Sequence, residues 1–244
     1  MVWKSVAMCL VLGACGGARV VVVDEDEGVE TDGAEDATDE LPATTGATAA
    51  GDLREALVAE AQRQLVAMTS SHYVHHTHVD EQRGVFDFDC SGFVGYALSR
   101  SAPEAWAPIA AQRRRPLAKD FEAFFSAPVA PWTPVTLAAE IRPGDVIAWI
   151  EPPENHSKNT GHVVIAADAP RPGERANELV VRVIDSSHSG HGKADARVRE
   201  HRNGLGTGEL VLHLDRGGRA VGYRWSTWAH SRLFHTPIAI GHLP

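Results

Sequence analysis

The chain is poor in cysteine: Cys9, Cys15 and Cys90 are the only three among its 244 residues. Cys9 and Cys15 lie in an N-terminal segment that is typical of an export signal, so Cys90 is the thiol expected in the mature protein. A single thiol cannot pair within its own chain, which excludes a fold held together by disulfides. Cys90 is therefore either an inert buried side chain or a reactive one.

The N-terminal apolar segment is too short to cross a bilayer as a mature helix. It covers residues 5–12 and ends in Leu12-Gly13-Ala14-Cys15, which resembles the lipobox of bacterial lipoproteins. We expect residues 1–15 to be a lipoprotein signal peptide, with Cys15 acylated and the exported protein anchored by its lipid. Gly16 favours the outer membrane, facing the periplasm. An ordinary signal peptide with a chance cysteine is the alternative.

Positive charge is absent from the segment that follows. Between Val20 and Asp52 the chain carries eleven acidic residues and no Lys or Arg. Such a composition cannot bury enough apolar surface to offset the entropy lost on ordering. Residues 16–52 are therefore predicted to be a disordered acidic linker. A segment that binds a basic partner is the alternative.

Acidic and basic residues are equal in number from Leu53 onward. A protein that binds nucleic acid needs a concentrated basic face. The basic run Arg113-Arg114-Arg115 is explained by a solvated helix end. The charge balance therefore argues against nucleic acid as a partner.

Residues 53–244 suit one folded domain. Three helices are predicted from apolar spacing, from a capping residue or from both. They cover residues 53–68, a segment from Cys90 onward, and residues 117–125. Apolar runs bounded by turns predict strands at residues 146–150, 162–166 and 179–185, and a hairpin of 209–214 with 220–225. Helices followed by strands indicate an α+β fold, with N-terminal helices packed on an antiparallel sheet.

Cys90 is expected at the first turn of a helix that Asp89 caps. Unpaired N–H groups and the positive end of the helix dipole favour the thiolate, which is the nucleophilic form. The same N–H groups can donate to an oxyanion. Ser91 and Gly92 are small and leave room for a substrate carbonyl.

A thiol nucleophile needs a base, and His162 is the predicted one. It follows Gly161 and begins an otherwise apolar strand, which is an unusual place for a polar residue. The next strand ends in Asp185, which would orient the imidazole if the two strands pair. His188 competes with Asp185 for that role and is a candidate cleft residue.

Two groups of histidines are interpreted as exposed loop residues near the cleft. His72, His75, His76 and His78 form a cluster, but no cysteine or second cluster completes a tetrahedral metal site. His191 lies with His188 in a Gly/Ser-rich loop. The sequence predicts no metal and no cofactor.

Three blocks of the sequence resemble the NlpC family of papain-like cysteine peptidases of bacterial cell walls. They are Asp89-Cys90-Ser91-Gly92-Phe93, Pro143-Gly144-Asp145-Val146 and Gly161-His162-Val163, and the resemblance covers roughly residues 53–187. It implies a papain-like domain over residues 53–244. By the resemblance Cys90 is the nucleophile, His162 the general base and Asp185 the third residue, while Tyr73 lines the substrate site.

The resemblance also implies an activity: cleavage of amide bonds in peptidoglycan stem peptides, through a thioester. The alternatives are a non-catalytic lipoprotein that binds wall peptides, and an amidase or acyltransferase with another substrate. Two features depart from the family pattern. Asp185 stands where the family commonly has His, Asn or Gln, and residues 190–244 extend past the usual end of the domain, either to cover the site or to complete the sheet.

Overall fold

The computed structural model describes residues 52–155 and 159–244. The predicted signal peptide, its Cys15 and residues 16–51 of the predicted linker lie outside the described residues. None of the helices in the described part is long and apolar enough to cross a membrane.

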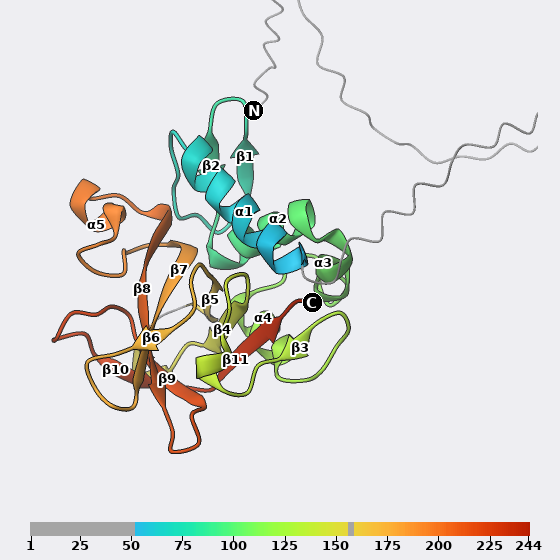
Figure 1. Cartoon of the computed structure of the whole chain (residues 1–244). Coiled ribbons are helices and arrows are strands. Elements are labelled where there is room, and N and C mark those ends of the chain that lie inside the picture. Colours follow the sequence, from blue (N-terminus) through green and yellow to red (C-terminus); the bar gives the residue numbers. More distant parts are fainter. Residues whose placement is uncertain (1–51, 156–158) are drawn as a thin grey trace, which may run out of the picture. The chain divides into compact units, whose positions relative to one another are not determined.

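Helices make up much of the N-terminal half of the described chain (Figure 1). Their bounds are α1 (Asp52–Ala67), α2 (Cys90–Ser101), α3 (Pro103–Ala110), α4 (Ala118–Phe125) and α5 (Ala196–Glu200), with short 3-10 turns η1 (Ala138–Glu140) and η2 (Pro153–Asn155). The sequence predicted α1 and α4 to within about one residue, and it predicted the start of α2 at Cys90. It did not predict α3, which begins with a proline at a position where the helix needs no N–H.

The strands form one large antiparallel sheet in the order β10-β9-β8-β7-β5-β4-β11-β3, with β6 beside β7. Their bounds are β3 (Thr133–Pro134), β4 (Val146–Ile150), β5 (Gly161–Ala166), β6 (Arg171–Pro172), β7 (Glu178–Ser187), β8 (Gly204–Leu214), β9 (Ala220–Arg224), β10 (Leu233–His235) and β11 (Ile238–His242). Two further strands, β1 (His78–Asp80) and β2 (Val85–Asp87), pair separately. The α+β prediction is confirmed at this level.

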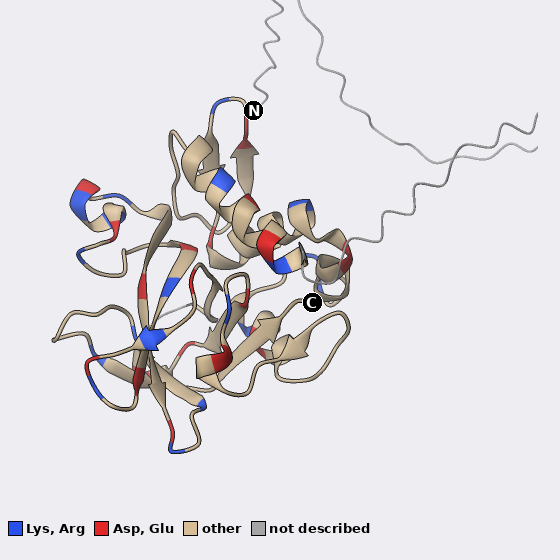
Figure 2. Cartoon of the chain, in the orientation of Figure 1, with Lys and Arg blue, Asp and Glu red and all other residues tan. Residues whose placement is uncertain are grey.

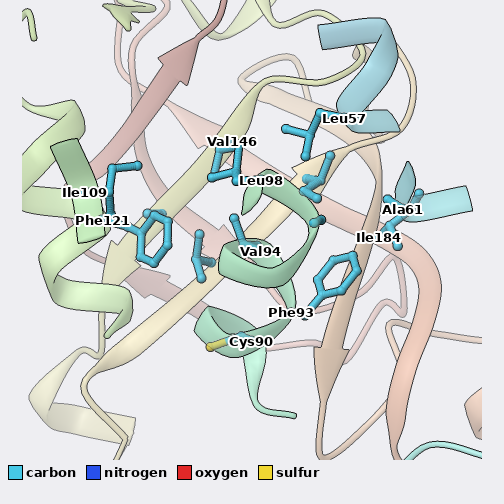
Figure 3. Close-up of a cluster of buried hydrophobic side chains, with 14 of the residues drawn as sticks. Leu57, Ala61, Cys90, Phe93, Val94, Leu98, Ile109, Phe121, Val146 and Ile184 are labelled. Atoms are coloured by element: carbon cyan, nitrogen blue, oxygen red, sulfur yellow. The ribbon is translucent and has the colours of Figure 1, made fainter. Parts of the chain in front are cut away.

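The core lies on both faces of the sheet. Helix α2 packs on β5 and β7, and α4 packs on β4, β5 and β11. Val163 and Ile165 belong to the cluster under these helices, while Val164 belongs to a second cluster. Successive side chains of a strand point to opposite faces, so His162 shares the face of Val164, away from α2. Figure 3 shows the helix-side cluster, with Cys90 at the end of α2.

The C-terminal segment completes the sheet. Strands β8, β9 and β10 extend it on one side, and β11 lies between β4 and β3. The hairpin of β8 and β9 around residues 215–218 matches the prediction. Figure 2 shows Lys and Arg interspersed with Asp and Glu along these elements and the helices.

The core packing predicts the cost of one truncation. Leu98 of α2 is fully buried in the helix-side cluster. We expect Leu98→Ala to lower the free energy of unfolding by about 2–5 kcal/mol, because it removes apolar contacts and leaves a cavity. Urea denaturation measures this change. Val66→Ala, at a side chain that is 88% exposed, is the control and should change stability by about 0.5 kcal/mol or less. Equal effects of the two substitutions would contradict the packing described here.

Candidate active site

The Cys90 thiol lies at the first residue of α2 and is only 4% exposed. Asp89 caps the helix, as the sequence predicted. Its Oδ1 accepts hydrogen bonds from the N–H of Gly92 at 2.8 Å and from the Ser91 hydroxyl at 3.0 Å. The cap fixes the first turn, and with it the position of the sulfur.

The expectation that the helix terminus lowers the pKa of this thiol is wrong for the resting state. Burial raises the pKa of Cys90, and the Asp89 carboxylate raises it further, while the backbone N–H groups of Val163 and Ser91 lower it. The backbone N–H groups thus lower the thiol pKa, as the sequence predicted, but burial raises this pKa by more. The thiol is protonated at neutral pH, so a base has to remove its proton when it reacts.

Arg115 offsets part of the Asp89 charge. Its guanidinium donates to Oδ2 of Asp89, and Nδ1 of His75 lies 3.5 Å from the same oxygen. The interpretation of residues 113–115 as a solvated helix end is thus wrong for Arg115. The segment is the loop between α3 and α4, and it places one cation at the Asp89 cap, in the hollow that Cys90 also lines. No local sequence pattern indicates this contact, because the two residues are 26 positions apart.

His162 and Asp185 meet as the sequence predicted. His162 is the second residue of β5, and β7, which carries Asp185, pairs with β5. Nε2 of His162 lies 2.7 Å from Oδ2 of Asp185. Because a carboxylate only accepts, Nε2 carries the hydrogen and Nδ1 offers its lone pair. Within the described residues, Nδ1 of His162 has no hydrogen-bond partner.

Asp185 is fully buried and held by two further residues. Arg197 donates to Oδ1 at 2.8 Å and also to Asp195, while Nε2 of His191 lies 3.1 Å from Oδ2. Burial alone would raise the pKa of Asp185. The Arg197 and His191 charges and the hydrogen bonds of both histidines instead hold this pKa well below its usual range. Asp185 is therefore ionised at neutral pH.

The prediction that His191 is an exposed loop residue is wrong: it is 1% exposed. Its Nδ1 contacts the carbonyl oxygen of Trp225 at 2.8 Å, and its Nε2 faces Asp185. Both partners only accept, so the ring satisfies both contacts when both nitrogens carry a hydrogen. The Trp225 ring stacks on His191 at 4.0 Å and meets His162 edge-on at 5.0 Å. The C-terminal segment thus covers the site as well as completing the sheet.

Two glycines of β8 leave room for the side chains of Arg197 and His191, which hold Asp185. A Cβ at Gly206 would lie 2.3 Å from Nε of Arg197, and one at Gly208 would lie 2.5 Å from Cβ of His191. Gly206 stands opposite Asp185 in the ladder. Glycine in a strand interior often marks such a close approach. The alternating glycines of β8 were the one sequence signal that something packs tightly there.

Two adjoining hollows open beside the site. The first, of about 260 Å³, is lined by Cys90, Ser91 and Arg115 among others, and the second, of about 280 Å³, by His162 and His188 among others. Tyr73, Asn159 and Gly161 line both. The predicted substrate residues therefore border these two neighbouring hollows: Ser91 the first, His188 the second and Tyr73 both.

Gly92 and Gly161 have packing roles. Gly92 lines neither hollow, and a Cβ there would lie 2.8 Å from the Thr77 hydroxyl, so its small size serves helix packing. Gly161 has φ +145°, and a Cβ would lie 1.9 Å from the carbonyl oxygen of Trp149. Only glycine fits where β5 enters the site.

No hydrogen bond joins Cys90 to His162 in residues 52–155 and 159–244. The sulfur instead faces the N–H of Val163, the residue that follows His162. Contacts of this kind are often long in a free enzyme and close when substrate binds. The sulfur thus lies at the backbone of β5 next to His162, while the two side chains line neighbouring hollows.

His162, Asp185 and His191 are also a set of possible metal ligands, because their donor atoms lie within 4.8 Å of one another. A metal needs the lone pairs of the ring nitrogens. Here Nε2 of both rings is hydrogen-bonded to Oδ2 of Asp185. The arrangement fits a hydrogen-bonded support for His162 better than a metal centre. The cluster of His72, His76 and their neighbours is exposed, as predicted.

The chain is similar to the uncharacterized protein R653 of Acanthamoeba polyphaga mimivirus. The two are 31% identical over 176 residues, which cover 64% of this chain and 77% of R653. No protein-family model matches the chain, and no solved structure matches it. The resemblance to NlpC peptidases therefore rests on the residues themselves.

The Arg115–Asp89 contact predicts the reactivity of the thiol. In Arg115→Gln the Asp89 charge is no longer offset, so the pKa of Cys90 should rise further. Alkylation of the folded protein by iodoacetamide at a fixed pH near 8 should then slow by roughly threefold to tenfold, as followed by intact mass. Arg113→Gln is the matched control, because Arg113 pairs with Asp120 instead. If both variants react like the wild type, the charge of Arg115 does not act on the thiol.

Proposed function

We propose that this chain, which belongs to the same family as the uncharacterized mimivirus protein R653, is a cysteine-dependent hydrolase of amide bonds. The observation that carries the proposal is the His162–Asp185 contact at 2.7 Å, formed next to the strand residue whose N–H faces the Cys90 sulfur. A thiol, an imidazole whose Nδ1 has no hydrogen-bond partner among the described residues, and an ionised carboxylate that orients this imidazole support the proposal.

The proposed reaction begins with proton transfer from Sγ of Cys90 to Nδ1 of His162. The sulfur attacks the carbonyl carbon, and the resulting oxyanion is stabilised by N–H groups at the start of α2. The imidazolium, held by Asp185, gives its proton to the leaving nitrogen as the C–N bond breaks. Water then attacks the thioester with His162 as the base, which releases a carboxylic acid and restores the thiol.

The buried support for Asp185 argues for catalysis rather than binding alone. A buried carboxylate that loses one of its ionic partners costs about 3–5 kcal/mol, and Asp185 keeps Arg197 and two imidazoles around it. A protein that only binds a peptide does not need a base oriented in this way. An amidase or acyltransferase would use the same groups, and the products distinguish it from a peptidase.

The fold, substrate and location are proposed on the resemblance. A helix that begins at the nucleophile and packs on the strand of the base supports a papain-like interpretation of the fold. Peptidoglycan stem peptides are the proposed substrates and the bacterial envelope the proposed location. An export signal with acylated Cys15 would deliver the domain there, on a lipid anchor that faces the periplasm.

Digestion of purified wall peptides in water enriched with ¹⁸O tests the proposal. Wild-type protein should produce a new amino terminus and a new carboxylate that carries one ¹⁸O, as detected by mass spectrometry. Cys90→Ala should abolish the products, and Asp185→Asn should slow their formation by roughly a hundredfold or more.

Cys90→Ala must keep the wild-type melting temperature, so that loss of products reflects the lost thiol and not unfolding. The control is Ser99→Ala, at an exposed residue of α2, which should cleave like the wild type. Transfer to an added amine without ¹⁸O uptake would favour an acyltransferase. Intact peptides with the wild type, or equal cleavage by Cys90→Ala, would refute the peptidase proposal.

A further inference from the structure

The hollow beside His162 has aromatic walls and one acidic side chain. Its volume is about 280 Å³, enough for the end of one long side chain. Rings line it from several elements: Tyr73, Trp149, Tyr223, Trp225 and Phe234. Glu151 is the acidic residue in the lining, and in the described part of the chain no Lys or Arg lines it. Aromatic faces attract cations, and a neighbouring carboxylate strengthens this attraction.

The Glu151 carboxylate and the aromatic wall face the same space. Burial raises the pKa of Tyr223, and the charge of Glu151 raises it further. The Asn155 side-chain amide donates to Oε1 of Glu151, which fixes the carboxylate near the rings. Trp149 and Tyr223 lie with ring centroids 4.7 Å apart. Negative charge and π-electron density therefore converge in the hollow.

One ring of this wall, Phe234, already holds a cation from the protein itself. The guanidinium of Arg232 lies 4.9 Å from the centroid of the Phe234 ring. Arg232 is exposed and is not among the residues that line the hollow.

The proposed chemistry decides which part of a substrate meets this hollow. His162 must hand its proton to the leaving nitrogen, so that nitrogen lies on the His162 side of the Cys90 sulfur. The hollow is on this side, whereas Arg115 and Asp89 line the hollow at Cys90. The group that enters the aromatic hollow is therefore attached to the leaving amine.

We propose that the hollow bounded by Glu151, Tyr223 and Trp225 binds an ammonium or guanidinium group carried by the leaving-amine part of the substrate. That this group belongs to the leaving-amine part of the substrate rests on the proposed function. The binding of a cation rests on the hollow alone. Substrates whose leaving residue has a cationic side chain are then preferred over equally long neutral ones.

Binding is tested with full-length Cys90→Ala protein, which cannot turn over. N-acetyl-lysinamide and N-acetyl-norleucinamide have the same number of side-chain carbons, and only the lysine compound carries a terminal ammonium. Both are titrated to tens of millimolar, with the tryptophan indole N–H signals followed by NMR. We expect the lysine compound to bind roughly threefold to tenfold more tightly and to shift the signals of Trp149 and Trp225. Added salt should reduce the preference. Glu151→Gln should remove most of it, and Glu140→Gln, a distant exposed carboxylate, should not.

Equal binding of the two compounds, no saturable binding of the lysine compound, or an unchanged preference in Glu151→Gln would overturn the proposal. Hydrolysis by the wild type is measured in parallel, with lysine or norleucine as the leaving residue. Preferential binding without any hydrolysis would refute the hydrolase and leave the cation site standing. Hydrolysis without preference for the lysine substrate would refute the cation site alone.

Discussion

The site depends on one buried carboxylate. Asp185 is removed from water, and it stays ionised because Arg197, His162 and His191 all contact it. Each partner comes from a different place in the chain, so the carboxylate joins β5, the loop before α5 and α5 itself into one unit. Its negative charge sets the tautomer of His162 and stabilises the imidazolium that the proposed reaction forms.

Burial has opposite outcomes for the two acids of the site. The pKa of Asp185 is held low by its cationic partners, while the pKa of the Cys90 thiol is raised, since burial and Asp89 outweigh two backbone N–H groups. One group is thus a fixed charge and the other a proton source. Environments that push the pKa values of neighbouring groups apart are typical of acid–base sites, and His162 is the residue placed to receive the proton.

The sequence predicted what local pattern controls. The helix at Cys90, its Asp89 cap and the strand that begins near His162 follow from capping and apolar runs, and the contact of His162 with Asp185 follows from the pairing of adjacent strands. Sequence reasoning could not find Arg197 or the burial of His191, because the segment after β7 folds back onto Asp185 through tertiary packing that no local pattern specifies. The raised thiol pKa was missed for the same reason: burial is a property of the packed core and no local pattern contains it.

The central claim is that His162 takes the proton of the Cys90 thiol, and alkylation of that thiol in the folded protein tests it most directly. The account predicts that at pH 7 iodoacetamide modifies Cys90 faster in the wild type than in His162→Ala. The difference should shrink as the pH rises, because hydroxide then deprotonates the thiol in both proteins. Equal rates at neutral pH, or a thiol that reacts only after unfolding, would contradict the account.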